Sequence, residues 1–210
     1  MGQGQINRGS LAGETLFNLA TTPKNKVFVE IGSWNGQGST KCIMDGLIKR
    51  MDESYLISIE ASKKFFDLAA GFWKTHLFSY SNTKKEKLRL SHGRIIEPTD
   101  MLPIEEIMKS NFAIEDYKKW YADDVENMSG APNLFDTIPD KIDVLVLDGG
   151  EFSTYPEYLL LRDRARIIVC DDSSVYKCFQ IREELLNDTS FVTLIDEPNQ
   201  RNGFCVFERL

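Results

Sequence analysis

Two apolar runs constrain the fold of this chain more than any other feature. Residues 142–147 are apolar except for Asp143, and residues 167–170 are apolar throughout. Such runs are typical of strands that are buried on both faces of a parallel sheet. Parallel neighbours need long crossover connections, which are usually helices that cover the sheet. We therefore expect a layered α/β fold.

The rest of the sequence alternates between strand and helix patterns, as such a sheet requires. The expected strands are residues 26–30, 55–60, 87–91, 142–148, 166–171, 191–195 and 204–208. The expected helices are residues 10–20, 39–51, 62–76, 155–163 and 174–187. This order predicts a doubly wound, Rossmann-like sheet that is mostly parallel, with helices on both faces. The last two strands are separated only by turn-forming residues, so we expect a C-terminal antiparallel hairpin.

Residues 98–140 interrupt this alternation. A chain of 210 residues fits a single domain, here residues 1–210, and the interruption is longer than a crossover needs. It predicts an insertion with a helix around residues 103–121 and a loop around residues 129–139. At the C-terminal edge of the sheet, this segment would form a lid or an acceptor pocket. The alternative is an acidic, solvated pair of helices.

Composition excludes several classes of function. A net charge of −7 and a pI near 5.0 argue against a nucleic-acid partner. No apolar run reaches the ~18 residues of a membrane-spanning helix, and no signal peptide is recognised, so we expect a cytoplasmic protein. The cysteines form no CxxC pair, which indicates reduced, packed thiols rather than a zinc site. They are Cys42, Cys170, Cys178 and Cys205.

A glycine-rich loop follows the first expected strand. Gly32, Gly36 and Gly38 follow the acid Glu30 within eight residues, and the pattern predicts a helix start at Ser39. Glycine lets the main chain turn sharply and approach a ligand closely. The free N–H groups of the loop and of the helix N-terminus favour an anionic group. The segment therefore predicts a site for a nucleotide-like or amino-acid-like cofactor.

Acids stand at the ends of the expected strands, where ligands bind in open α/β sheets. Glu60, at the end of the second strand, can accept hydrogen bonds from both hydroxyls of a ribose; the alternative is a strand-end acid that faces water. Glu30 would brace the glycine loop or reach an amino group of the cofactor.

A second acidic group comes from the fourth and fifth strands. Asp148, Asp171 and Asp172 would lie roughly 5 Å apart if these strands are neighbours. Carboxylates at that distance repel one another, and a hard divalent cation such as Mg²⁺, Ca²⁺ or Mn²⁺ relieves the repulsion. In the alternative interpretation, Asp172 only caps the helix that begins near Ser174.

The motifs resemble those of a known enzyme class. The spacing of Gly32, Gly36 and Gly38 differs from the dinucleotide pattern GxGxxG and resembles the first motif of class I S-adenosylmethionine-dependent methyltransferases. LDGGEFSTY at residues 147–155 and IVCDD at residues 168–172 resemble motifs of metal-dependent, macrocin-type sugar O-methyltransferases. Catechol O-methyltransferases share the general arrangement, and glycan-modifying methyltransferases of bacteria and large algal viruses are similar. The resemblance covers about residues 26–210.

This resemblance implies S-adenosylmethionine as a cofactor and a divalent metal, Mg²⁺ or Mn²⁺, held by Asp148, Asp171 and Asp172. A sugar hydroxyl must lose its proton during methyl transfer, and Asp148 is the catalytic residue that we expect to accept it. The alternative base is His92 or His76, although a lone histidine is more often structural. The cofactor-binding residues that we expect are Glu30, Gly32, Ser33, Trp34, Gly36, Gly38, Ser39, Glu60, Ala61, His92 and Asp148. The chain departs from the family at residues 150–152. It has Gly-Glu-Phe there, whereas an acid and a tyrosine are common in the family.

The expected function is a metal-assisted O-methyltransferase that acts on a carbohydrate hydroxyl. The acceptor is expected to be a small molecule or a glycan, with a deoxyhexose such as rhamnose as the specific prediction. An NAD-dependent oxidoreductase is one alternative, but it would need the absent GxGxxG motif. The other is a catalytically inactive binding module that keeps the fold and docks a partner through its acidic insertion.

Overall fold

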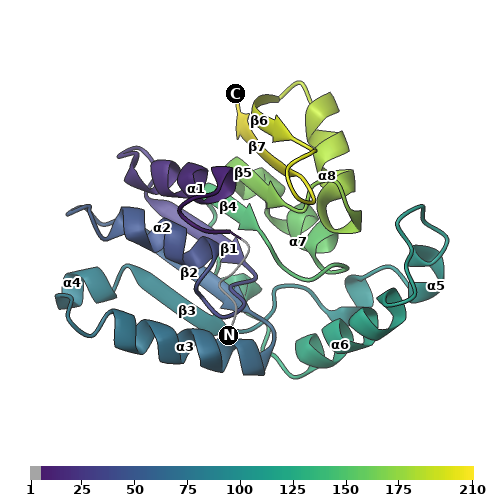
Figure 1. Ribbon diagram of the computed structural model, residues 1–210, viewed down its shortest axis with the longest axis horizontal. Helices are drawn as coiled ribbons and strands as arrows, with labels where there is room; N and C mark the ends of the chain where they lie inside the picture. Colours follow the sequence, from purple (N-terminus) through teal and green to yellow (C-terminus); the bar gives the residue numbers. More distant parts are fainter. Residues whose placement is uncertain (1–5) are drawn as a thin grey trace.

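The computed structural model describes residues 6–210 and contains a seven-stranded sheet in the order β3-β2-β1-β4-β5-β7-β6 (Figure 1). Pairing is parallel from β3 to β5, and β7 is antiparallel to both β5 and β6. The doubly wound sheet and its C-terminal hairpin are therefore confirmed. The strands are β1 Val27–Ile31, β2 Tyr55–Glu60, β3 Leu88–His92, β4 Ile142–Leu147, β5 Ala165–Asp171, β6 Phe191–Glu197 and β7 Phe204–Arg209.

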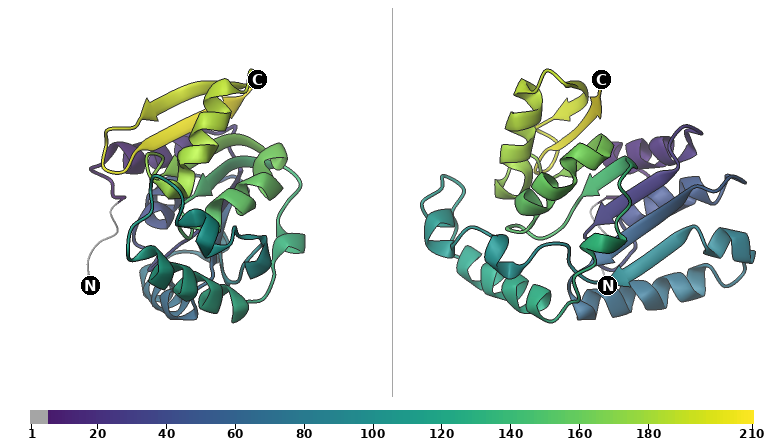
Figure 2. Two further views of the ribbon diagram at one scale, coloured as in Figure 1. Left: turned by 90° about the vertical axis from the view of Figure 1, so that its right-hand side faces the viewer. Right: turned by 180° about the vertical axis from the view of Figure 1, so that it is seen from behind.

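Helices cover both faces of the sheet (Figures 1 and 2). Side chains of α1, α2 and α3 pack in one apolar cluster, and those of α7 and α8 pack in another. The α-helices are α1 Leu11–Thr21, α2 Ser39–Leu47, α3 Lys63–His76, α4 Asn82–Lys85, α5 Ile104–Ile107, α6 Tyr117–Ser129, α7 Thr154–Leu161 and α8 Tyr176–Asn187. Short 3₁₀ turns are η1 Pro98–Asp100, η2 Phe135–Thr137 and η3 Arg162–Arg164.

Strand β4 shows why its sequence is almost continuously apolar. Val144 and Val146 pack against the α1–α3 side, whereas Leu145 and Leu147 pack against the α7–α8 side. All four side chains are buried. Because successive side chains of a strand point to opposite faces, a sheet that is covered on both faces needs apolar residues at nearly every position.

The direction of winding reverses between β1 and β4. Ile31 of β1 is paired with Ile59 of β2 on one side and with Leu147 of β4 on the other. The loops that follow β1 and β4 therefore diverge to opposite faces, which leaves a crevice at the carboxyl ends of these strands. This switch point places the glycine loop beside the acidic tips of β4 and β5.

The structure of residues 98–140 differs from the prediction. The single helix expected around residues 103–121 is wrong: the chain forms the short α5, turns through Ser110 and Asn111, and forms α6 from Tyr117 onward. Ser and Asn are weaker helix formers than Ala, Leu, Glu or Lys. The loop expected after residue 129 contains η2. In Figures 1 and 2, α5 and α6 (teal) lie away from α1 and α2.

Some smaller features match the expectations from sequence, and others differ from them. The second helix ends at Leu47 rather than residue 51, and α4 was not expected. The four cysteines are free and buried, as predicted. Among residues 6–210, no helix has both the length and the apolarity that crossing a membrane requires.

Candidate active site at the strand tips

A cavity of about 400 Å³ lies at the carboxyl ends of β1, β2, β4 and β5. Its walls come from the glycine loop, the acidic strand tips and one side of α6. Ten of the predicted site residues line it: Gly32, Ser33, Trp34, Gly38, Ser39, Glu60, Ala61, Asp148, Asp171 and Asp172. Glu30, Gly36 and His92 are not lining residues and lie behind the wall.

Backbone strain is concentrated around this cavity. Within residues 6–210, three non-glycine residues have φ in the left-handed region: Trp34 at 46°, Asp172 at 59° and Arg201 at 52°. All three line the cavity. Residues other than glycine adopt this conformation at an energetic cost and persist in it where the surrounding structure holds them, commonly at ligand sites. The strain therefore makes the cavity the candidate functional site.

Two glycines of the loop serve different contacts. Gly32 has φ +88°, and a Cβ atom there would lie 2.2 Å from the carbonyl oxygen of Asp148. Only glycine therefore allows the loop after β1 to pack directly on the loop after β4. Gly36 has φ +74°, and a Cβ atom there would lie 2.7 Å from Nε1 of Trp73. Gly36 thus fits the loop against α3 rather than forming the cavity wall.

Glu60 is held by main-chain groups. The backbone N–H of Trp34 donates to its Oε2 at 2.7 Å, and the N–H of Ser62 donates to its Oε1 at 2.9 Å. Burial raises the pKa of Glu60 to about 7, although these two hydrogen bonds oppose the shift. Each oxygen can accept a further hydrogen bond, so the carboxylate is fixed in place and can bind two ligand hydroxyls.

Glu30 and His92 support the wall from behind. Buried Glu30 accepts hydrogen bonds from the hydroxyls of Thr40 and Ser58, which joins β1 to α2 and β2. Of the two roles expected for Glu30, these contacts correspond to bracing the loop. Burial raises its pKa to about 7. His92 places Nε2 3.1 Å from the carbonyl oxygen of Ala61, which does line the cavity.

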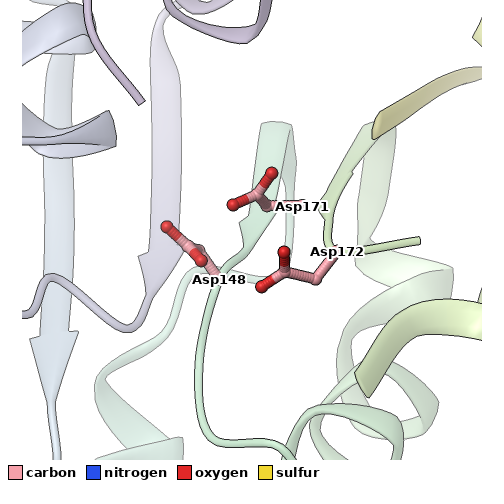
Figure 3. Close-up of side chains that lie close together, drawn as sticks. All are labelled: Asp148, Asp171 and Asp172. Carbon is pink, nitrogen blue, oxygen red and sulfur yellow. The ribbon is translucent and has the colours of Figure 1, made fainter. Parts of the chain in front are cut away.

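The three aspartates converge as predicted. Figure 3 shows the carboxylates of Asp148, Asp171 and Asp172 turned toward one another, and one oxygen of each lies within 4.8 Å of the others. Burial, together with the charges of Asp148 and Asp172, raises the pKa of Asp171 to about 6. The capping alternative for Asp172 is wrong, because the N-cap position of α8 is Val175 and no side chain caps it.

Two side-chain cations accompany this cluster. Nζ of Lys177 lies 2.9 Å from Oδ1 of Asp148 and 2.8 Å from Oδ2 of Asp172. Nη2 of Arg201 lies 3.0 Å from Oδ2 of Asp171. Burial alone would lower the pKa of Lys177, but the charges of Asp148 and Asp172 outweigh it and raise that pKa well above its usual value. The cluster is therefore a network of three carboxylates and two cations.

This network does not fit a divalent cation as it stands. Oδ1 of Asp148 and Oδ2 of Asp172 already face the ammonium of Lys177, which lies beside the oxygens that an ion shared by the three aspartates would use. Two cations in contact would repel strongly in a partly buried site. A divalent ion would therefore bind these aspartates weakly while Lys177 stays in place.

Four further charged residues line the cavity and were not predicted: Arg94, Asp124, Glu157 and Arg201. Lys177, which contacts Asp148 and Asp172 from outside the set of lining residues, was not predicted either. Lys177 lies in the first turn of α8, where the helix dipole disfavours cations, and this mismatch was a signal available in the sequence. Arg201 lies in the β6–β7 turn, where nothing in the sequence distinguishes it. Glu157 lies in a predicted helix after Asp148, and its sequence pattern does not distinguish it from an ordinary helical residue.

Asp124 and Glu157 bring unmet hydrogen-bonding capacity to the cavity. Oδ2 of Asp124 and Oε2 of Glu157 are buried and have no hydrogen-bond partner. Burial raises the pKa of Asp124 to about 6 and that of Glu157 to about 8. Because buried polar atoms are normally paired, these oxygens are suited to donors of a bound ligand.

Gly150 makes room for Asp124. A Cβ atom at position 150 would lie 2.8 Å from Oδ2 of Asp124, which comes from α6. The carboxylate of Asp124, from the 98–140 segment, thus lies where a side chain at position 150 of the β4–α7 loop would otherwise stand. The neighbouring Glu151 accepts a hydrogen bond from the hydroxyl of Tyr117 at 3.0 Å, a second link between that loop and α6.

No protein-family model and no curated protein matches the sequence. The fold, in contrast, matches solved structures. A candidate caffeoyl-CoA O-methyltransferase from Staphylococcus aureus has a TM-score of 0.63 at 13% identity, over 98% of this chain and 85% of the other. An O-methyltransferase from Bacillus cereus in complex with SAH has a TM-score of 0.59 at 12% identity, over 99% and 84%. The O-methyltransferase TomG from Streptomyces achromogenes in complex with SAM has a TM-score of 0.57 at 14% identity, over 94% and 78%. The chain therefore has the Rossmann-like fold of these O-methyltransferases.

Proposed function

We propose that this protein is an S-adenosylmethionine-dependent O-methyltransferase that acts on a carbohydrate hydroxyl. One observation carries the proposal. A single cavity at the switch point joins a glycine loop and a fixed strand-end carboxylate, Glu60, to a proton acceptor, Asp148. Neighbours with this fold are O-methyltransferases, two of them in complex with the donor or its product.

The donor fits the half of the cavity beside β1 and β2. Glu60 would accept hydrogen bonds from the ribose hydroxyls. The loop from Gly32 to Gly38 and the N-terminus of α2 would receive the carboxylate of the methionine moiety. Glu30 and His92 would hold the loop and Ala61 in position from outside the cavity. This arrangement offers main-chain contacts and carboxylates rather than a dinucleotide phosphate site, so an NAD-dependent reaction is disfavoured.

The acceptor fits the half beside β4 and β5. Carboxylates accept hydrogen bonds from sugar hydroxyls, and three of them converge there. Trp34 is 42% exposed, and its ring centroid lies 5.9 Å from that of Phe65, so the two rings offer an apolar platform on the donor side of the cavity. A deoxyhexose such as rhamnose would bring hydroxyls to the three carboxylates of the acceptor half.

The proposed reaction is an in-line displacement. The acceptor oxygen attacks the methyl carbon of the sulfonium, the carbon–sulfur bond breaks, and its electron pair stays on sulfur to give S-adenosylhomocysteine. The acceptor proton passes to a carboxylate oxygen of Asp148. The cavity contributes mainly by holding the oxygen, the methyl carbon and the sulfur in line.

The 98–140 segment would act as a lid over this reaction. Asp124, Asn127 and Met128 of α6 line the same cavity as Glu60 and Asp148. A wall built partly from this segment would exclude water from the donor and leave the acceptor half open at its rim. The buried, free cysteines are consistent with a reducing compartment such as the cytoplasm.

Thermal unfolding with candidate ligands tests the donor assignment. The melting temperature would be measured with S-adenosylhomocysteine and, separately, with NAD. A ligand at 100 times its Kd stabilises the folded state by about 2.7 kcal/mol, which is readily detected. We expect stabilisation by S-adenosylhomocysteine alone. Stabilisation by NAD alone would favour an oxidoreductase, and methylated product in a screen of rhamnose-terminated and other glycans would identify the acceptor.

A further inference from the structure

The position of Lys177 is not explained by donor binding. Lys177 is the second residue of α8, and its side chain is only 6% exposed. Helix N-termini disfavour cations, and an ammonium group is costly to bury unless it is paired. A lysine at this position must therefore gain its stabilisation from the carboxylates that it meets.

Those carboxylates come from two different strand ends. The ammonium lies 2.9 Å from Asp148, which follows β4, and 2.8 Å from Asp172, which follows β5. Distances below 3 Å between charged groups are typical of strong, charge-assisted hydrogen bonds. Lys177 therefore bridges the two strand tips, which is the place that a shared metal ion would take.

The other contacts of Asp171 and Asp172 leave little uncompensated negative charge for a second cation. Arg201 lies 3.0 Å from Asp171 and 3.6 Å from Asp172, and Asn202 donates to Asp172 at 3.0 Å. The ammonium of Lys177 is itself fixed by its two carboxylate partners.

We propose that Lys177 is the resident cation of the acidic cluster and that methyl transfer in this cavity proceeds without a divalent ion. The second clause rests on the proposed function; the first does not. A fixed ammonium beside Asp148 would stabilise negative charge that develops on the acceptor oxygen as its proton leaves. It would also keep the three neighbouring carboxylates from repelling one another.

Binding of Mn²⁺ tests the first clause without any turnover. Electron paramagnetic resonance and calorimetric titration would be carried out on the wild type, on Lys177→Met and on Lys177→Gln. The matched control is Lys109→Met, because Lys109 is an exposed lysine that is paired with Glu106 at 2.7 Å. We expect weak binding by the wild type and the control. Loss of the Lys177 charge should tighten Mn²⁺ binding at least about tenfold, because a like charge in contact with the ion is removed.

Two results of the Mn²⁺ experiment would overturn the proposal. Tight binding of one Mn²⁺ per wild-type chain would overturn it, and this measurement needs no variant to fold. Equally weak binding by a Lys177 variant that still melts cooperatively would also overturn it.

The second clause is tested by methyl transfer by the wild type in EDTA and in Mg²⁺. We expect equal rates, and a rate abolished by EDTA and restored by Mg²⁺ would contradict the clause. S-adenosylhomocysteine titration reports on the proposed function separately, since absence of donor binding would leave the Mn²⁺ result unaffected.

Discussion

The two halves of the cavity hold their carboxylates in different ways. In the donor half, Glu60 is fixed by main-chain N–H groups of Trp34 and Ser62. In the acceptor half, Asp148 is held by a side-chain cation, Lys177, from a helix that follows much later in the chain. Main-chain contacts follow from the fold itself, whereas a side-chain contact can be changed by one substitution. We infer that the donor half is set by the fold and that the chemistry of the acceptor half is particular to this chain.

The largest effect that would separate the two halves is expected from Asp148→Asn. The amide cannot take up the acceptor proton, and loss of a general base typically lowers the rate by about 100- to 10,000-fold. Steady-state kinetics should show this loss in kcat, while calorimetry should show a nearly unchanged Kd for S-adenosylhomocysteine. Retained turnover would remove Asp148 from the proposed mechanism.

Gly32→Ala addresses the boundary between the halves. The new methyl group would meet the main chain of Asp148 at a residue with φ +88°, so we expect a loss of about 3 kcal/mol or more in the free energy of unfolding. Gly71→Ala is the matched control, because nothing lies within 4 Å of a Cβ atom there. It should stabilise α3 by up to about 1 kcal/mol. Urea unfolding measures both, and similar stabilities would refute the close packing of the two loops.

Glu60→Gln tests the donor half alone. A neutral amide replaces a carboxylate that would accept two ribose hydroxyls, each worth about 1.5 kcal/mol, so the Kd for S-adenosylhomocysteine should rise about 100-fold. Exposed Glu53 provides the control, and Glu53→Gln should leave the Kd unchanged. An unaltered Kd in Glu60→Gln would mean that the donor is bound elsewhere.

Glu157→Gln should have the smallest effect of these site variants, and its effect on the free energy of unfolding should depend on pH. The pKa of Glu157 is raised from its ordinary 4.5 to about 8 by burial, and then by Asp124. Between these values the folded chain keeps a proton that the unfolded chain releases, so this group makes the protein less stable as pH rises from 4.5 to 8. The variant lacks this penalty. It should match the wild type near pH 4.5 and be more stable by about 1–2 kcal/mol at pH 9. Chemical denaturation at both pH values measures this, and a constant difference would contradict the assigned titration.

The donor half could be predicted from sequence because its signals are local. The apolar run of β1, the glycines that follow it and the acid at the end of β2 each act through the adjacent main chain. The apolar continuity of β4 and β5 likewise reflects burial on both faces, which depends on pattern rather than on particular partners. Asp148 and Asp171 could be expected to lie close together because they stand at the ends of β4 and β5, provided that these strands are neighbours.

The acceptor half could be predicted only in part. Contacts of Lys177 and Arg201 with the aspartates join segments that are remote in sequence, and no local periodicity encodes such pairs. The helix expected around residues 103–121 failed for a related reason. Its central residues have reasonable helical patterning, but turns at Ser110 and Asn111 divide it, and the anchoring of α6 through Tyr117 against Phe152 depends on tertiary packing.

A crystal structure with bound S-adenosylhomocysteine tests the central claim most directly. The claim is that donor and acceptor meet in one cavity whose halves are fixed by Glu60 and by the Asp148–Lys177 pair. The account predicts ribose hydroxyls bonded to Glu60 and the sulfur atom directed toward Asp148, with Lys177 still between Asp148 and Asp172. A ligand bound away from Glu60, or a sulfur atom that faces away from Asp148, would contradict it.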